Sequence, residues 1–126
     1  MFLLDTDILI WILRGKKDVK EKVSKLKEKS PLAISVISIA EIFRNVFPSE
    51  LSTTEDFLNQ HIIFNLDQKT AKIGGLYCQQ YSKQLKNLTL DDCLIAGCAN
   101  VNDLELVSLN TKHFPMQDIK TLNPLR

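Results

Sequence analysis

The sequence predicts an α/β fold, a three-layer α/β/α sandwich around a mostly parallel central sheet of four or five strands. Short apolar runs alternate along the chain with stretches whose apolar residues recur every three or four positions, as in strands joined by helices that cover a sheet. The chain has 126 residues, of which 44% are hydrophobic and 25% charged. These values fit one globular domain over residues 1–126 and exclude collagen-like and disordered chains.

The first strand and the first two helices are predicted within residues 2–29. Residues 2–4 form a short apolar run, and an apolar stretch follows from Asp7 to about Arg14 as the first helix. The second helix covers residues 17–29 and ends before Pro31. Its apolar residues recur at the spacing of one helix face: Val19, Val23 and Leu26.

The middle of the chain alternates strand and helix. Residues 32–37 read as a buried strand, and residues 38–47 as a helix that ends before Pro48. A polar helix follows at residues 54–60, and the apolar run over residues 61–66 is the third strand.

The last part of the chain supplies the remaining helices and strands. Asp67 has the character of an N-cap for a long helix whose apolar residues are Ala71, Ile73, Leu76, Tyr77 and Tyr81. Gly74 and Gly75 weaken that helix locally. Another helix runs from Thr89 to about Asn100, residues 104–109 are the fourth strand, and residues 119–122 are a short edge strand.

Charge is balanced over the whole chain but not along it. Sixteen Lys and Arg and fifteen Asp and Glu give a formal net charge of +1, so no global basic field gathers nucleic acid. Residues 14–29 differ, because they hold eight Lys and Arg and three acids, a local charge of +5. This segment either contacts phosphate without reading sequence or is the solvated face of an amphipathic helix.

The apolar N-terminus, residues 1–13, has neither the form of a signal peptide nor that of a membrane anchor. Asp5 and Asp7 interrupt it, and a membrane span needs roughly 20 apolar residues. We therefore expect a cytoplasmic protein that makes no membrane contact.

The cysteines and the single tryptophan are assigned to the core. Cys78, Cys93 and Cys98 lack the spacing of a metal site and are expected to be reduced thiols. Trp11 lies on a short apolar helix and is expected to be buried.

Four polar side chains follow predicted strands or begin predicted helices. These are Asp5 after the first strand, Glu41 and Asp92 in the first turns of two helices, and Asn110 after the fourth strand. Ligands of open parallel sheets bind outside the carboxyl ends of the strands, so these side chains could converge. Two carboxylates about 4 Å apart repel by roughly 4 kcal/mol at an effective dielectric of about 20, so such a cluster needs a proton or a cation. Oxygen ligands without His or Cys favour Mg²⁺ or Mn²⁺ over zinc.

The same acids also have a purely structural interpretation. Ser38 with Glu41, and Thr89 with Asp92, have the spacing of capping boxes, and helix dipoles favour acids in the first turn. Asp5 fits this interpretation less well, because a carboxylate at the end of an apolar run is costly unless it is solvated, paired or metal-bound. All three acids fall at positions that could meet at one edge of the sheet, and this favours a functional site.

Four segments of the chain carry motifs that belong together. They are Leu3-Leu-Asp-Thr-Asp-Ile-Leu-Ile, Ile34-Ser-Val-Ile-Ser-Ile-Ala-Glu-Ile, Leu90-Asp-Asp-Cys-Leu-Ile-Ala-Gly-Cys-Ala and Leu106-Val-Ser-Leu-Asn-Thr-Lys-His-Phe. In this order and at this spacing, over essentially the whole chain, they resemble PIN-domain proteins of the VapC toxin type. The resemblance implies a PIN-like α/β/α fold and an Mg²⁺-dependent ribonuclease that a cognate antitoxin restrains.

The resemblance also assigns roles to individual residues. It implies that Asp5, Glu41 and Asp92 are catalytic, with Asp5 and Asp92 holding the metal and Glu41 orienting the attacking water. The fourth acid of the family is missing, since Asn110 and His113 stand at its two usual positions. Asn110 can still offer its side-chain carbonyl oxygen to a metal or to a bound water. Two supporting residues are also expected: Thr6 could orient Asp5, and Asp7 could replace the missing charge or cap the first helix.

Partners follow from the same resemblance, and two other functions remain open. The family implies an RNA substrate, a homodimer and a VapB-type antitoxin whose C-terminal segment crosses the active site. The chain could instead be a catalytically weak PIN-like module that binds RNA or antitoxin. A haloacid dehalogenase-like phosphatase would use Asp5-Thr6-Asp7 as its nucleophile motif and Asp91-Asp92 as late metal ligands, but it would leave Glu41 without a role.

Overall fold

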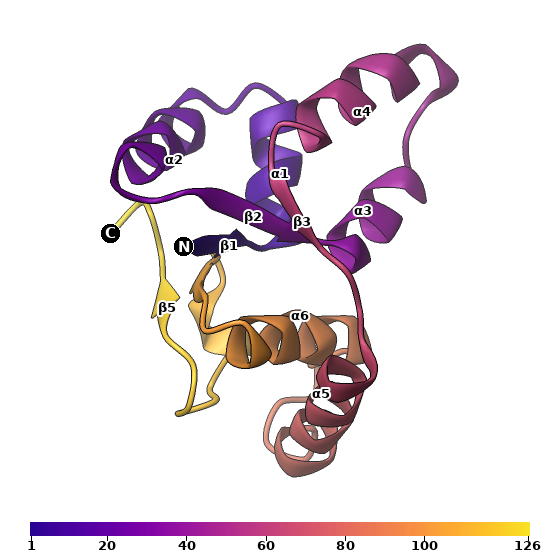
Figure 1. Cartoon of the computed structure of the whole chain (residues 1–126), viewed down its shortest axis with the longest axis vertical. Helices are drawn as coiled ribbons and strands as arrows, with labels where there is room; N and C mark the ends of the chain where they lie inside the picture. The colour runs from indigo at the N-terminus through magenta and orange to yellow at the C-terminus, as the bar shows by residue number, and fades with distance from the viewer.

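A five-stranded parallel sheet with helices on both faces forms the centre of the protein, described here by a computed structural model of residues 1–126 (Figure 1). The strands are β1 (Phe2–Leu4), β2 (Leu32–Ser35), β3 (Ile62–Phe64), β4 (Glu105–Val107) and β5 (Thr121–Leu122). Their order across the sheet is β3-β2-β1-β4-β5, and every neighbouring pair is parallel. The predicted α/β/α sandwich is therefore confirmed, with five strands in its sheet.

Six α-helices connect the strands. They are α1 (Thr6–Leu13), α2 (Lys17–Lys29), α3 (Val36–Phe43), α4 (Leu51–Leu58), α5 (Gln68–Tyr81) and α6 (Leu90–Val101), with short 3₁₀ turns at Pro48–Glu50 and Thr111–His113. Figure 1 shows α1 to α4 on one side of the sheet and α5 and α6 on the other. None of these helices is both long and apolar enough to span a membrane.

Alternation along the strands divides the core into two layers. Leu4, Ile34 and Val107 point to one face of the sheet and pack with apolar residues of α1 to α4. Leu3, Ala33 and Leu106 point to the other face and pack with α5 and α6. All six side chains are fully buried, as expected of strands that are covered on both faces.

Helices α5 and α6 pack closely because each carries a glycine at the contact. A Cβ atom on Gly97 would lie 3.0 Å from the carbonyl oxygen of Thr70 and 3.1 Å from the backbone nitrogen of Gly74. The glycines at positions 74 and 75 do not break α5, which continues to Tyr81. Close helix packing offsets the low helix propensity of glycine at this point.

The second strand ends earlier than predicted, and the helix after it both begins and ends earlier. The Ser35 side chain accepts a hydrogen bond from the backbone nitrogen of Ile37 and caps α3, so β2 ends at Ser35 and not at residue 37. The prediction that Ser38 caps this helix was wrong, because Ser38 lies inside it and is fully buried. Glu41 consequently lies in the second turn of α3, and the helix ends at Phe43, before residue 47.

Other boundaries shift by a few residues. The predicted strands over residues 61–66, 104–109 and 119–122 are shorter in the structure. The predicted polar helix at 54–60 is α4, which begins at Leu51 directly after the 3₁₀ turn. All three cysteines are free thiols, and Cys93 and Cys98 are buried.

Trp11 is not a core residue, contrary to the prediction. Its side chain is 39% exposed on α1, whereas the buried residues of this helix are Thr6, Ile8 and Leu9. Residues 8–13 are apolar without interruption, so periodicity does not reveal which side of the helix faces solvent.

Candidate active site at the carboxyl edge of the sheet

The predicted site residues gather where the strands end. Asp5 follows β1 and is the N-cap of α1, and Glu41 comes from α3 after β2. Ser108, which the sequence did not predict, follows β4 at the same edge. Asp92 comes from the first turn of α6. Because β1 lies between β2 and β4, these segments meet around Asp5 at the carboxyl edge of the sheet.

Asp5 is buried and is held by one bond on each carboxylate oxygen. The backbone N–H of Thr6 donates to Oδ1 at 2.8 Å, and the hydroxyl of Ser108 donates to Oδ2 at 2.9 Å. Only 7% of Asp5 is exposed, and Ser108 is fully buried. The carboxylate is therefore fixed in direction by one group from α1 and one from the segment that follows β4.

Asp7 lies beside Asp5 but is not the cap of the first helix. Its Oδ2 accepts the Ser108 hydroxyl at 3.3 Å and the backbone N–H of Leu109 at 3.1 Å. Its Oδ1 is buried and has no hydrogen-bond partner. A buried carboxylate oxygen without a partner is costly, and a cation could compensate it.

Thr6 connects the first acid to the second. Its backbone N–H binds Asp5, while its hydroxyl donates to Glu41 Oε1 at 2.6 Å. The Ser38 hydroxyl lies 2.8 Å from the same Thr6 oxygen and acts as the donor there, because the Thr6 proton points to Glu41. The expected contact of Thr6 with Asp5 is thus made by its main chain, and its hydroxyl positions Glu41 instead.

Asp92 forms the capping box that the sequence predicted as its structural role. Its backbone N–H donates to the Thr89 hydroxyl at 3.1 Å, and its Oδ2 accepts the Thr89 N–H at 3.4 Å, which is a capping box. The same oxygen lies 3.8 Å from Nδ1 of His113. Asp92 therefore lies near His113, which stands at one of the two usual positions of the family's fourth acid.

The acids influence one another electrostatically, although they come from separate segments. Burial, helped by the charges of Asp7 and Asp92 and opposed by the hydrogen bonds from Ser108 and Thr6, raises the pKa of Asp5 to about 7. Burial also raises the pKa of Asp7. For Glu41, burial is the main cause of a raised pKa, opposed by the Thr6 hydrogen bond and reinforced by the charges of Asp91 and Asp92.

Several contacts at this edge were not anticipated from the sequence. Ser108 and Ser38 are buried hydroxyls that hold Asp5 and Thr6 in place. The only sequence signal for them is a serine within an otherwise apolar run, which is weak. Asn110 is exposed, and only its backbone N–H takes part, donating to Ser108 at 3.0 Å.

The donor set suits a hard divalent cation better than a soft one. All of the acids offer oxygen ligands, and the unpartnered oxygen of Asp7 together with the raised pKa of Asp5 shows that no cationic side chain compensates these two carboxylates. In these side-chain positions no three His, Cys, Asp or Glu residues are close enough to form a complete metal-binding group.

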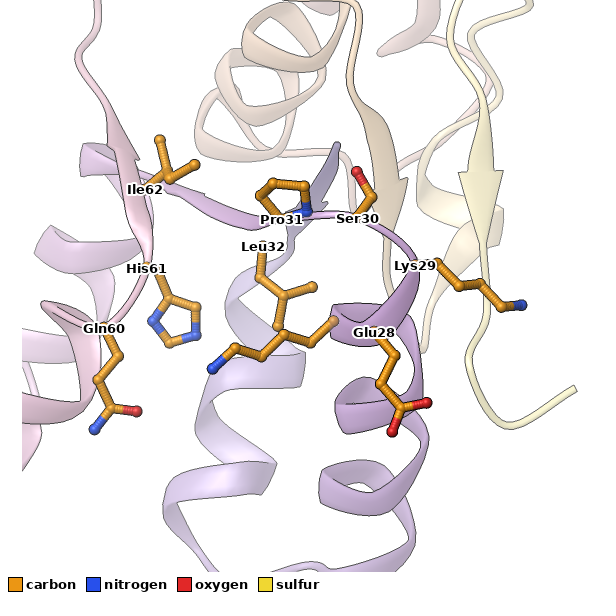
Figure 2. A pocket seen from close by; sticks show the side chains of 9 residues that line it. Glu28, Lys29, Ser30, Pro31, Leu32, Gln60, His61 and Ile62 are labelled. Carbon is orange, nitrogen blue, oxygen red and sulfur yellow. The ribbon is translucent and has the colours of Figure 1, made fainter.

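One cavity adjoins this site and another lies far from it. The first, of about 280 Å³, is lined by Glu41 together with Arg14, Leu13 and Phe47, so it opens beside Glu41. A roomier one of about 430 Å³ lies at the opposite edge of the sheet, between the end of α2 and the start of β3. Figure 2 shows that its polar side chains diverge, with Lys29 extending away from His61. It lacks a converging set of catalytic groups.

Comparison with known proteins places the whole arrangement in a family. The PIN domain family matches residues 2–118. The chain is 34% identical over 116 residues to Ribonuclease VapC10 of Mycobacterium tuberculosis, a match that covers 92% of this chain and 87% of that protein. It is 31% identical over 117 residues to Ribonuclease VapC19 of the same species, over 92% of this chain and 94% of the relative.

A solved structure has the same fold over nearly its full length. A toxin–antitoxin complex from Klebsiella pneumoniae contains a chain that superposes with a TM-score of 0.80 at 28% identity. The match covers 98% of both chains. The arrangement of strands and helices around the carboxyl edge is therefore shared with that protein.

Proposed function

The chain belongs to the PIN domain family, in its VapC branch, and on this premise we propose that it is a metal-dependent endoribonuclease toxin. The observation that carries the proposal is the bridge made by Thr6. This residue binds Asp5 through its N–H and Glu41 through its hydroxyl, so that carboxylates from β1 and α3 are held at one place. The charge of Asp92 acts on both of them.

In the proposed reaction Asp5, Glu41 and Asp92 have different tasks. Asp5 and Asp92 would hold Mg²⁺, with Mn²⁺ as a substitute, and Asp7 supplies a further charge beside them. The bound ion would stabilise the charge that develops on the phosphate and lower the pKa of the attacking water. Glu41, fixed by Thr6, would accept a hydrogen bond from that water and orient it toward phosphorus.

Ser108 and Ser38 would act as positioning residues in this scheme. Ser108 fixes the direction of the Asp5 carboxylate, and Ser38 fixes the hydroxyl that in turn fixes Glu41. Groups of this kind determine the orientation of ligating carboxylates, and their loss lowers activity without removing a ligand.

The proposed partners are an RNA substrate, a cognate VapB-type antitoxin and a second copy of the chain. Support comes from the name of the Mycobacterium tuberculosis relatives, which are ribonucleases, and from the Klebsiella pneumoniae structure, which is a toxin–antitoxin complex. We further propose that residues 1–126 act as one PIN domain and that the reaction takes place in the cytoplasm, where RNA is available.

The alternatives have less support. A haloacid dehalogenase-like phosphatase would leave Glu41 idle, whereas its carboxylate is held at 2.6 Å by Thr6. A weak binding module would follow from the missing fourth acid, but Asp7 already adds a buried carboxylate next to Asp5.

The decisive experiment is cleavage of total cellular RNA by the purified, antitoxin-free chain in Mg²⁺, in Mn²⁺ and in EDTA. We expect discrete fragments with either metal, none in EDTA, and none from the Asp5→Asn variant. Asp103→Asn is the matched control, because Asp103 is exposed at the other edge with φ of 52°, a backbone conformation that asparagine tolerates well. Equal cleavage by Asp5→Asn would remove Asp5 from the mechanism, and no cleavage by the folded wild type would favour the binding module.

A further inference from the structure

An exposed tryptophan with two cations over its ring lies at the end of α1, outside the acidic site. Trp11 is 39% exposed. The guanidinium carbon of Arg14 lies 5.6 Å from the ring centroid, and the ammonium nitrogen of Lys16 lies 5.0 Å from it. We define these three residues as the Trp11 patch.

The turn after α1 holds the patch together. Gly15 has a φ of +82°, which residues with side chains rarely adopt, and its N–H donates to the carbonyl of Ile12. The chain then folds back so that the N–H of Lys16 donates to the carbonyl of Trp11 at 2.9 Å. The position of Lys16 beside the indole ring is thus determined by the backbone.

The cations of the patch have no acidic partner. The one ion pair of the structure joins His113 and Asp92, so Arg14 and Lys16 are free to bind an anion. They also begin the segment 14–29, whose net charge is +5, and the exposed lysines of α2 continue from them. An aromatic face beside unpaired cations matches the two parts of a nucleotide, a flat base and a charged phosphate.

The patch is connected to the acids. Arg14 and Glu41 line the same cavity of about 280 Å³. Asp5 caps the start of α1, and Trp11 lies six residues along it, about 9 Å at 1.5 Å per residue. A few nucleotides of single-stranded RNA can cover a span of this size.

We propose that Trp11 stacks on an unpaired base of the RNA, a few nucleotides from the cleaved bond, while Arg14 and Lys16 bind its phosphates. The proposal rests on the ribonuclease function above and adds a subsite that recognises single-stranded RNA. An unpaired base is required, because bases within a duplex are stacked on one another and cannot reach an aromatic side chain.

Intrinsic fluorescence gives a direct test, because Trp11 is the only tryptophan of the chain. A ten-nucleotide single-stranded RNA of mixed sequence is titrated into the wild-type protein in EDTA, beside a blunt duplex of the same sequence. We expect saturable quenching by the single strand and little by the duplex. Binding of the single strand, followed by anisotropy of a labelled RNA, without any quenching would overturn the proposal.

Variants then separate stacking from charge. Trp11→Leu is expected to weaken binding of the labelled single strand about 10-fold or more, as loss of a stacked base does, and to leave the salt dependence unchanged. Trp11→Phe should bind the single strand with an affinity between those of Trp11→Leu and the wild type.

Arg14→Gln should lower the slope of log affinity against log salt by about 1. The charge control is Lys22→Gln, which replaces an exposed lysine on α2 away from the ring. Equal affinity of Trp11→Leu and wild type would overturn the proposal.

Cleavage assays distinguish this inference from the function it rests on. If the wild type cleaves RNA and Trp11→Leu cleaves it with the same KM, the subsite is wrong and the nuclease stands. If the wild type does not cleave but its fluorescence is quenched by single-stranded RNA, the subsite stands and the nuclease fails. Circular dichroism of each variant verifies the fold, which the exposed position of Trp11 should leave intact.

Discussion

The two edges of the sheet hold polar side chains in different ways. At the carboxyl edge, Asp5, Thr6 and Ser108 are buried and joined by hydrogen bonds of 2.8 and 2.9 Å. At the amino edge, the cavity lined by residues 27–32 and 60–62 is roomier, yet the side chains of Ser30 and Gln60 make no hydrogen bond and Lys29 extends away from His61 (Figure 2). Volume alone does not identify a site, whereas buried charge held by fixed donors does.

The pKa values of Asp5 and His61 are shifted in opposite directions at the two edges of the sheet. Asp5 has a folded pKa of about 7 against an ordinary value of 3.8, so the protonated form is favoured in the folded state. His61 at the amino edge has a pKa below its ordinary 6.5, with burial as the main cause. Ionised Asp5 therefore opposes folding at neutral and higher pH, while protonated His61 opposes it in acid.

The largest predicted effect comes from removing the charge of Asp5. Its contribution to stability is fully present below pH 3.8 and is lost as the pH rises to about 7. Asp5→Asn, which cannot ionise, should therefore gain stability relative to wild type over this range, by up to about 4 kcal/mol at 1.4 kcal/mol per pH unit. Urea unfolding in EDTA at pH 4.5, 6 and 8 measures the difference.

The control for this experiment is Asp103→Asn at the amino edge, an exposed residue. The difference in unfolding free energy between Asp103→Asn and the wild type should stay nearly constant with pH. A constant difference for Asp5→Asn as well would mean that Asp5 is ionised and compensated in the folded protein, and the contrast between the edges would disappear.

The next largest effect concerns the donor that fixes Asp5. Ser108→Ala removes the hydroxyl that binds Asp5 Oδ2 at 2.9 Å, and loss of such an orienting group lowers metal affinity or activity by about 10-fold to 100-fold. RNA cleavage at saturating and at low Mg²⁺ measures both quantities. Ser30→Ala at the amino edge, where the hydroxyl has no partner, is the matched control and should cleave like wild type. Equal rates for the two variants would show that Ser108 is only a packing residue.

The sequence predicted the placement of the acids better than their connections. Apolar runs such as residues 2–4 set the strands, and in a parallel sheet the residue after each strand must lie at the same edge, so the position of Asp5 followed from the pattern. The hydrogen bond from Thr6 to Glu41 joins residues 35 positions apart, and no local pattern encodes it.

Buried hydroxyls and exposed aromatics were the failures of prediction, for related reasons. Ser38 and Ser108 lie within apolar runs, where a serine carries no signal of its partner. Trp11 lies on a helix that is apolar on all sides, so no face could be assigned to solvent. In both cases the outcome depends on which elements pack against the residue and which leave it exposed, and only the tertiary structure supplies this.

The smallest predicted effect belongs to the amino edge. His61→Gln removes an imidazole whose Nδ1 lies 3.3 Å from the carbonyl of Leu58, and half-buried surface changes of this kind shift stability by about 0.5 kcal/mol or less at pH 7.5. Because the pKa of His61 is lowered, its stabilising contribution is present above pH 6.5 and is lost in acid. The variant should therefore improve relative to wild type between pH 7 and pH 5, the reverse of the Asp5→Asn trend, while RNA cleavage at pH 7.5 stays unchanged. A large loss of cleavage would give the amino edge a part in the reaction and would end the distinction between an organised and an unorganised edge.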